Sequence, residues 1–263
     1  MARTYTLVNQ KGGVGKTTSA INISAYLGYY GQRVLLVDLD PQANATSSVG
    51  LDKRAIKHGT YEVLIGSVPV IPQIWHSPRF KLSVLPSSPS LSGAEIELIE
   101  IDKREFRLRD VLAAVQNRFD YILIDCPPSL GLLTVNGLAA AQNGVIIPVQ
   151  CEYLALEGLG QLTQTINRVR ASLFPGLDIR GVIMTMYDSR ILLARDVVNE
   201  VRNYFPNQVF DSIIPRSTRL AEAPSRGQPI SVYAPESNAA KMYESLVREI
   251  LEQDGIHIPI LVT

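Results

Sequence analysis

The chain has few cysteines and no long hydrophobic run, and both absences exclude whole classes of protein. Cys126 and Cys151 are its only two cysteines. They form no CxxC motif and no disulfide framework, which is typical of the reducing cytoplasm. No apolar run reaches the roughly 18 to 20 residues that span a membrane, and the apolar run before the first glycine-rich loop is too short for a signal peptide. We therefore expect a cytoplasmic protein.

An excess of charge of one sign is also lacking. Lys and Arg total 25, Asp and Glu total 25, and the formal net charge is +0. Binding to nucleic acid must therefore come from a local basic patch, because the whole chain is not a polycation. The scattered His58, His76 and His257 predict no metal site. With 263 residues, of which 46% are hydrophobic, we expect one domain over residues 1–263.

Short β-branched runs alternate along the chain with longer helical patterns. The expected strands are residues 4–9, 33–40, 81–87, 121–127, 144–150, 181–187 and 208–215. The expected helices are residues 17–30, 105–117, 131–141, 154–172, 190–204 and 236–253. Several strands are apolar on both faces, as buried parallel strands require. The alternation predicts an α/β fold with a doubly wound, mostly parallel β-sheet flanked by helices.

Residues 50–80 are less regular than the rest. The segment contains Pro69, Pro72 and Pro78, and proline interrupts both helices and central strands. We expect a loop-rich connection there, with a short helix near residues 60–66.

A glycine-rich loop follows the first predicted strand and opens the first predicted helix. It reads VNQKGGVGKTTSA over residues 8–20, and the positions that satisfy G-x-x-G-K-T are Gly12, Gly15, Lys16 and Thr17. Glycines let backbone amides converge on phosphate oxygens, and a helix N-terminus adds positive potential. We expect Lys16 on the β- and γ-phosphates of ATP and the Thr17 hydroxyl on Mg²⁺. The loop therefore predicts a P-loop NTPase.

The loop departs from the general G-x-x-x-x-G-K-[ST] template, because Gln10 stands where the first glycine belongs. Its K-G-G-x-G-K-[ST] pattern resembles the deviant Walker A ATPases, which include ParA/Soj partition proteins, MinD division-site proteins, nitrogenase iron protein and the arsenite pump ATPase. The resemblance implies that Lys11 reaches across a dimer interface to the nucleotide of the other subunit. A cation supplied in this way makes catalysis depend on an ATP-dependent homodimer. The nucleotide-binding residues that it implies are Lys11, Gly12, Gly13, Val14, Gly15, Lys16, Thr17 and Thr18.

Two apolar strands end in carboxylates, and the C-terminal ends of parallel strands carry the ligand site. The first strand, VLLVDLD, ends with Asp38 and Asp40, and the second, YILID, ends with Asp125. Asp40 is placed to orient the attacking water and to touch the Mg²⁺ shell, while Asp125 is the expected Walker B carboxylate. For Asp38, a capping role and a functional role both remain open. The predicted catalytic residues are Lys11, Lys16 and Asp40, and the predicted Mg²⁺ ligands are Thr17, Asp40 and Asp125.

The stretch IIPRSTRLAEAPSRGQPI at residues 213–230 resembles the P-R-x-x-R-L-x-E-A-P-S-x-G block of ParA/Soj partition ATPases. DLDPQANATSSVG, DCPPSLGLLTVNGLAAA and GVIMTMYDSR extend the resemblance over nearly the whole chain, whereas residues 66–80 match no pattern of the family. Ala43 stands where many members have glycine. The resemblance implies that Arg190 and Arg219 contact DNA phosphates without reading sequence. It also implies that Met186 and Pro215 lie beside the adenine.

These expectations describe a slow, partner-stimulated DNA-partition ATPase. Its ATP-bound sandwich dimer binds double-stranded DNA of the nucleoid non-specifically, and a ParB-type centromere-binding partner stimulates hydrolysis and release. A MinD-like membrane-recruited ATPase is the alternative. The tail after Gly255 has no Lys or Arg for a basic amphipathic helix, and we expect an extended segment that is packed on the body or disordered. The intact P-loop and strand-end carboxylates disfavour a third hypothesis, a non-enzymatic binding protein.

Overall fold

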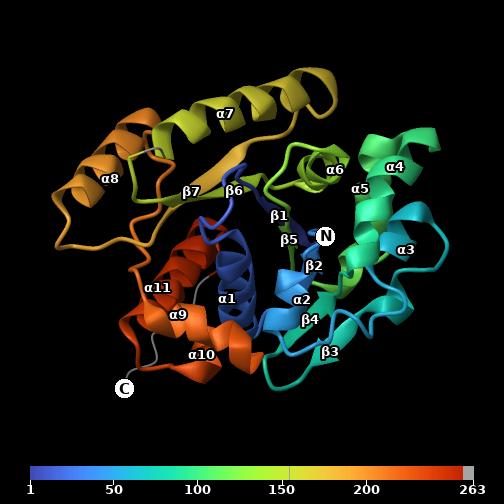
Figure 1. Cartoon of the computed structure of the whole chain (residues 1–263), viewed down its shortest axis with the longest axis horizontal. Coiled ribbons are helices and arrows are strands. Elements are labelled where there is room, and N and C mark those ends of the chain that lie inside the picture. Colours follow the sequence, from blue (N-terminus) through green and yellow to red (C-terminus); the bar gives the residue numbers. More distant parts are fainter. Residues whose placement is uncertain (154, 257–263) are drawn as a thin grey trace.

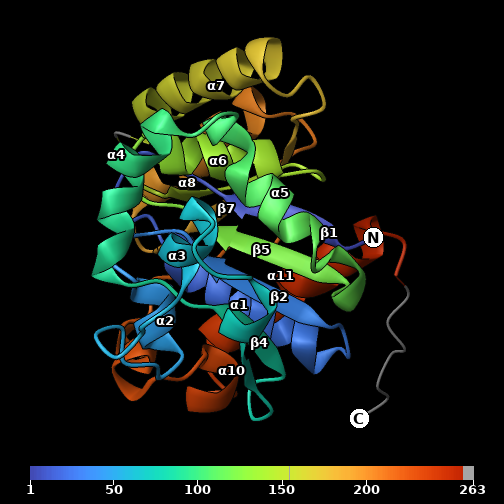
Figure 2. The ribbon, with the colours of Figure 1, turned by 90° about the vertical axis from the view of Figure 1, so that its right-hand side faces the viewer.

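A computed structural model of the chain describes residues 1–153 and 155–256. These residues build a seven-stranded sheet with the order β3-β4-β2-β5-β1-β6-β7 (Figures 1 and 2). The strands are β1 (Arg3–Leu7), β2 (Val34–Asp38), β3 (Trp75–Ser77), β4 (Leu82–Leu85), β5 (Tyr121–Asp125), β6 (Val145–Gln150) and β7 (Ile179–Thr185). Every neighbouring pair is parallel except β3 and β4. The expected doubly wound, mostly parallel sheet is confirmed.

Helices cover both faces of this sheet (Figure 1). One face carries α1 (Lys16–Tyr29) and α11 (Asn238–Gln253), which pack in one hydrophobic cluster. The other face carries α5 (Arg107–Ala113), α6 (Leu132–Ala140), α7 (Ala155–Ser172) and α8 (Leu192–Tyr204). The shorter helices are α2 (Asn44–Ser48), α3 (Thr60–Ile65), α4 (Ala94–Glu97), α9 (Thr218–Glu222) and α10 (Ile230–Tyr233). Short 3₁₀ turns occupy Ile71–Gln73, Pro89–Gly93, Leu98–Glu100, Arg104–Phe106, Gln116–Arg118 and Ala223–Arg226.

Strand β2 is apolar at successive positions because both of its faces are covered. Val34 and Leu36 enter the cluster formed with α1 and α11, whereas Leu35 and Val37 enter the cluster on the opposite face. Side chains alternate between the two faces of a strand, so a sheet covered on both sides buries every position. The same division holds in β5, where Leu123 faces the first cluster and Ile122 the second.

The register of the central strands determines where the functional residues meet. Asp125, the last residue of β5, pairs with Leu7 of β1 on one side and with Asp38 of β2 on the other. The chain leaves β1 directly into the glycine-rich loop, and α1 begins at Lys16. The loop and the two strand-end acidic segments therefore lie at one edge of the sheet.

The prediction of a strand over residues 208–215 is wrong. The segment runs beside β7 but forms only two isolated parallel bridges in the described chain, Val182 to Val209 and Tyr187 to Pro215. Between them the backbone amides of Asp211 and Ser212 donate to the Glu249 carboxylate on α11, each at 2.8 Å. These two successive amides therefore cannot donate to β7, and a continuous strand does not form.

The remaining differences concern short elements. The helix expected near residues 60–66 is present as α3, whereas β3 within residues 66–80 was not expected. This three-residue strand exists because it pairs with β4, and a run so short carries no periodicity of its own. The six expected helices are present, with ends shifted by a few residues. The expectations for residue 154 and for the tail from residue 257 onward lie outside the described residues.

Candidate nucleotide-binding site

The glycine-rich loop presents a set of unoccupied backbone donors. Gly13 and Gly15 have φ angles of 75° and 88°, a left-handed conformation that glycine adopts without strain. Among the described residues, no hydrogen-bond acceptor is found for the amides from Gly12 to Thr18. The first amides of a helix have no partner within the helix. The loop and the start of α1 therefore form a cradle suited to an anion.

Lys16 is buried at the centre of this cradle. Its ammonium donates to the Lys11 carbonyl oxygen at 3.1 Å, and the side chain is almost fully enclosed. Burial lowers the pKa of Lys16, while the Asp125 carboxylate acts in the opposite direction. A buried cation with a single carbonyl acceptor is under-compensated, so the position favours an incoming anion.

Asp125 is the complementary case. It is fully buried, and neither carboxylate oxygen has a hydrogen-bond partner in the described part of the chain. Burial raises the pKa of Asp125 well above its ordinary value, and the neighbouring Asp38 carboxylate raises it further. The Thr17 hydroxyl is close enough to oppose this increase, yet it lies outside hydrogen-bond geometry. Such an orphaned carboxylate costs free energy, and a cation would relieve that cost.

The residues around Asp125 fit a magnesium ion. Magnesium takes oxygen ligands and is usually held by one or two carboxylates together with substrate phosphates and water. Asp125 offers two free oxygens, and Thr17 and Asp40 add a hydroxyl and a second carboxylate nearby. Within residues 1–153 and 155–256, no three His, Cys, Asp or Glu side chains are grouped to hold a metal by themselves. Phosphate oxygens would therefore have to complete the shell.

The two acidic residues after β2 have different surroundings. Both Asp38 oxygens are occupied: one accepts from the Asp40 amide at 3.2 Å, and the other accepts from the amide and hydroxyl of Thr46, both at 2.7 Å. Burial raises the pKa of Asp38 to about 6, and the Thr46 hydrogen bonds lower it. Of the two roles left open for Asp38, the structure therefore favours the capping role, because its carboxylate holds the first turn of α2.

Asp40 is buried but less fully engaged. Its carboxylate accepts from the Gln42 amide at 2.8 Å, and its carbonyl accepts from the Ser87 hydroxyl at 2.9 Å. Its carboxylate acts electrostatically on Lys16. Ala43, which follows in the same loop, has a φ of 51°. Glycine would adopt this left-handed backbone with less strain than alanine.

The Lys11 side chain contacts an acidic residue outside the loop. Its ammonium forms an ion pair with Glu152 at 3.4 Å, and its amide donates to Asn9 Oδ1 at 3.0 Å. Glu152 follows the end of β6. The sequence did not single out Glu152, although its place just beyond a parallel strand is the same signal that identified Asp40 and Asp125.

A cavity of about 310 Å³ adjoins the loop. Gly15 and Thr18 line it, together with Met186, which directly follows β7. Further lining residues are Thr185, Ile214, Pro215, Arg216, Ser217, Leu220, Ala221 and Tyr243. Met186 has a φ of 54°, and a left-handed non-glycine residue is a strained feature that often accompanies a functional site. The cavity brings Met186 and Pro215 beside the loop.

Arg190 and Arg219 follow two segments that lie side by side. The isolated bridge between Tyr187 and Pro215 joins the two segments that lead to them. The Arg190 side chain is 86% exposed and forms an ion pair with Asp188 at 2.7 Å, while Arg219 pairs with Glu222 at 3.0 Å. Exposed pairs of this kind are weak, so a phosphate can displace the carboxylate.

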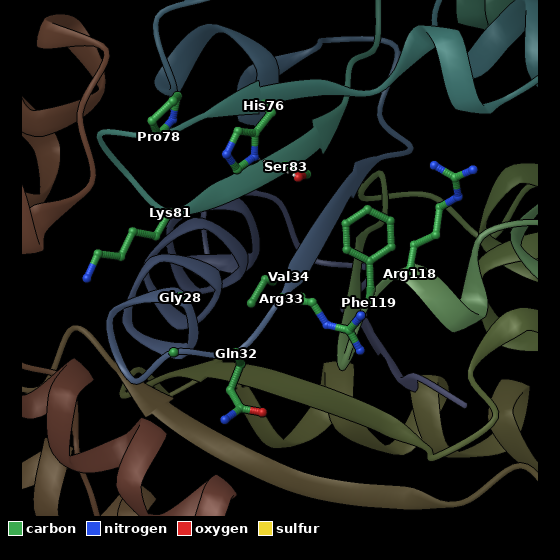
Figure 3. A pocket seen from close by; sticks show the side chains of 11 residues that line it. Gly28, Gln32, Arg33, Val34, His76, Pro78, Lys81, Ser83, Arg118 and Phe119 are labelled. Carbon is green, nitrogen blue, oxygen red and sulfur yellow. Dashed lines mark hydrogen bonds between the residues drawn. The ribbon is translucent and has the colours of Figure 1, made fainter.

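A second cavity, of about 580 Å³, lies at the opposite edge of the sheet (Figure 3). It is bordered by the start of β2 and the end of α1, and it contains Arg33, His76, Lys81, Arg118 and Phe119. Arg33 is engaged by Asp120 at 2.6 Å. In Figure 3 the charged ends of Lys81 and Arg118 point away from each other. The cations do not converge on one point, so this cavity lacks the geometry of the loop cradle.

No helix in the described ranges is both long enough and apolar enough to cross a membrane.

Comparison with known proteins adds a further set of findings. Residues 2–179 match the family model described as an AAA domain. The chromosome-partitioning ATPase Soj of Treponema pallidum is 51% identical over 97% of this chain and 99% of its own length. The chromosome partitioning protein ParA of Myxococcus xanthus is 51% identical over 97% of this chain and 89% of its own length.

Among solved structures, cobyrinic acid a,c-diamide synthase from Mycobacterium smegmatis, with a bound ATP analogue and magnesium, is also similar. It is 37% identical, with a TM-score of 0.85 over 98% of this chain and 99% of that one. The two partition relatives and this structure match nearly the whole chain, whereas the family model ends at residue 179.

Proposed function

Because the chain belongs to the Soj/ParA family of chromosome-partitioning ATPases, we propose that it hydrolyses ATP to ADP and phosphate to drive DNA segregation. The observation that carries this proposal is the pairing of a cradle of free amides with the orphaned, buried carboxylate of Asp125. An anion and a divalent cation that arrive together satisfy both. Magnesium nucleotide is such a ligand.

Each part of the site has its own role in this reaction. The amides from Gly12 to Thr18 bind phosphate oxygens, and Lys16 contacts the β- and γ-phosphates. Thr17, Asp40 and Asp125 would hold magnesium, which neutralises phosphate charge when it is bound. Asp40 orients the attacking water. Met186 and Pro215 border the cavity that we assign to the adenine.

Lys11 completes the site of a second copy of the chain. In the free chain its ammonium forms an ion pair with Glu152. A cation brought from the partner subunit stabilises charge on the transferred phosphoryl group, so hydrolysis requires the ATP-bound dimer. Slow turnover that a ParB-type partner accelerates is consistent with such an incomplete monomer site.

DNA binding follows from the same dimer. Arg190 and Arg219 would contact phosphates of the nucleoid without reading bases, and dimerisation doubles their number. Each phosphate contact adds about 0.9 to the salt slope of the binding constant. Since the diamide synthase shares less of the sequence than the partition relatives do, we assign this chain the partition role and not an amidation activity.

The decisive test measures binding to a random-sequence duplex with ATP, with ADP and without nucleotide, using Asp40→Ala to retain ATP. We expect binding with ATP alone, weakening steeply with salt. Replacing both Arg190 and Arg219 with alanine should reduce the salt slope by about 0.9 for each phosphate that is no longer neutralised. Arg118→Ala is the matched control, because Arg118 is also exposed but lies at the opposite edge of the sheet. An intact ATP dimer that binds no DNA would refute the DNA role.

A further inference from the structure

Glu152 joins the two sides of the candidate site. Its carboxylate lies 3.4 Å from the Lys11 ammonium and 3.5 Å from the Arg216 guanidinium. The Gln150 side-chain amide donates to it at 2.5 Å. Lys11 belongs to the glycine-rich loop, and Arg216 belongs to the segment that lines the 310 Å³ cavity. One carboxylate therefore contacts both the glycine-rich loop and the segment that lines the cavity.

The ion pair with Glu152 conflicts with the role proposed for Lys11. An ammonium has three donors, but a carboxylate of its own subunit competes with a phosphate held by the partner subunit for the same positive charge. The Lys11 side chain is 36% exposed and that of Glu152 is 46% exposed, so the pair is open to solvent and able to exchange. The contact is thus weak enough to break and specific enough to position Lys11.

We propose that Glu152 is a positioning residue that holds Lys11 within its own subunit until the ATP-bound dimer forms. The inference rests on the proposed trans role of Lys11. Opening the pair is then one step of dimerisation, and it occurs once in each subunit. Glu152 consequently opposes dimers that form without a nucleotide to bind Lys11, and it limits premature hydrolysis.

The size of this effect follows from the exposure of the pair. Ion pairs exposed to this degree correspond to about 1.4- to 5.4-fold in an equilibrium constant. Because two pairs open for each dimer, the dimerisation constant changes by about 2- to 30-fold. The effect must fall as salt increases, since ionic strength screens exposed charges.

The position of Lys11 can be tested without nucleotide and without a dimer. Lysines of the nucleotide-free chain are labelled with an amine-reactive ester and are quantified by peptide mass spectrometry, with the exposed Lys57 as internal reference. Glu152→Gln should speed labelling of Lys11 at low salt, and the difference from wild type should vanish at high salt. Glu200→Gln, which removes the same charge from the surface of α8, should leave Lys11 unchanged.

Arg216→Gln separates the two ion pairs of Glu152. It removes the guanidinium but leaves the carboxylate on Lys11, so Lys11 labelling should stay slow. Glu152→Asp keeps the charge on a shorter side chain and should give an intermediate rate. Unchanged labelling of Lys11 in Glu152→Gln would overturn the proposal.

Dimerisation provides the second measurement. In the Asp40→Ala background with ATP, Glu152→Gln should tighten the dimer by about 2- to 30-fold at low salt, as measured by analytical ultracentrifugation. A weaker dimer would show that Glu152 acts across the interface, and the proposal would fail. If wild type forms no ATP dimer at all, the proposed function fails, whereas the labelling result still reports on the ion pair between Lys11 and Glu152.

Discussion

Replacing Asp125 with asparagine is expected to stabilise the nucleotide-free protein and to abolish its response to magnesium ATP. The carboxylate is fully buried without a hydrogen-bond partner in the described chain. Asparagine has nearly the same shape but no charge, so the substitution removes the cost of burying the anion. It also replaces the charged carboxylate that we assign to magnesium with a neutral amide, which attracts a divalent cation far less strongly.

The magnitude follows from the missing donors. A buried acceptor without a partner costs about 1–3 kcal/mol, and a charged one costs more. A protein of this size changes its melting temperature by about 2–4 °C for each kcal/mol. Asparagine keeps an unpaired buried oxygen, so only the extra cost of the charge is removed. Asp125→Asn should therefore raise the melting temperature near pH 8 by about 2–4 °C for each kcal/mol of that extra cost.

The dependence on pH has a definite sign. The folded pKa of Asp125 is raised above its ordinary value of 3.8, so the unfolded chain releases this proton at a lower pH than the folded chain. The associated stability is complete below the unfolded pKa and is lost as pH rises through the folded pKa. Asp38 behaves alike, because burial raises its pKa from 3.8 to about 6, which corresponds to about 3 kcal/mol. Wild type and the Asp125→Asn variant both lose the stability that depends on Asp38, so the difference in stability between them reports on Asp125.

The assay is thermal unfolding from pH 5 to pH 8, with and without magnesium ATP. The melting temperature of the variant relative to that of wild type should increase as pH rises. Only wild type should be stabilised by the magnesium nucleotide. Asp211→Asn serves as control, because Asp211 is exposed and such substitutions usually change stability by less than about 0.5 kcal/mol. A variant that is less stable than wild type at pH 8 without nucleotide would refute the reasoning.

Three further outcomes are expected. Lys16→Ala should abolish ATP binding in equilibrium dialysis, and wild-type affinity would contradict the loop assignment. Asp254→Ala should destabilise the fold by about 3–5 kcal/mol in urea unfolding. Asp254 accepts hydrogen bonds from Tyr5 and Tyr121 at 2.7 and 2.8 Å, and it pairs with the mostly buried Arg180 at 3.1 Å. A loss of stability below about 1 kcal/mol would mean that solvent replaces these hydrogen bonds. Gly137→Ala should cost about 1–3 kcal/mol by overpacking, because a methyl group at this position of α6 meets the Cys126 sulfur, and calorimetry showing unchanged stability would argue against that clash.

The loop and the two strand-end carboxylates were predictable because each depends on local sequence. The strand, the glycines with positive φ and the helix follow one another directly in the sequence. The pattern from Gly12 to Thr17 therefore predicts the geometry of the phosphate-binding loop. Asp40 and Asp125 are recognisable because apolar runs precede them, and parallel strands bring such ends to one edge of the sheet.

Features that depend on distant partners were not predictable in this way. The 208–215 segment has the composition of a strand, but Glu249, far along the chain, takes two of its amides. The three residues of β3 form a strand only because β4 lies beside them. Asp254 closes a polar cluster with Tyr5, Tyr121 and Arg180, and no local pattern connects these positions.

The sequence by itself therefore determined the class of ligand, since phosphate and magnesium chemistry depends on residue types at short spacing, and it predicted which residues meet that ligand. Only the tertiary structure decided that Lys11 rests on Glu152 and that both Asp125 oxygens lack donors in the described chain. Ion pairs and desolvation depend on which side chains the fold brings within a few ångströms of each other, and residues 141 positions apart meet only in the folded chain.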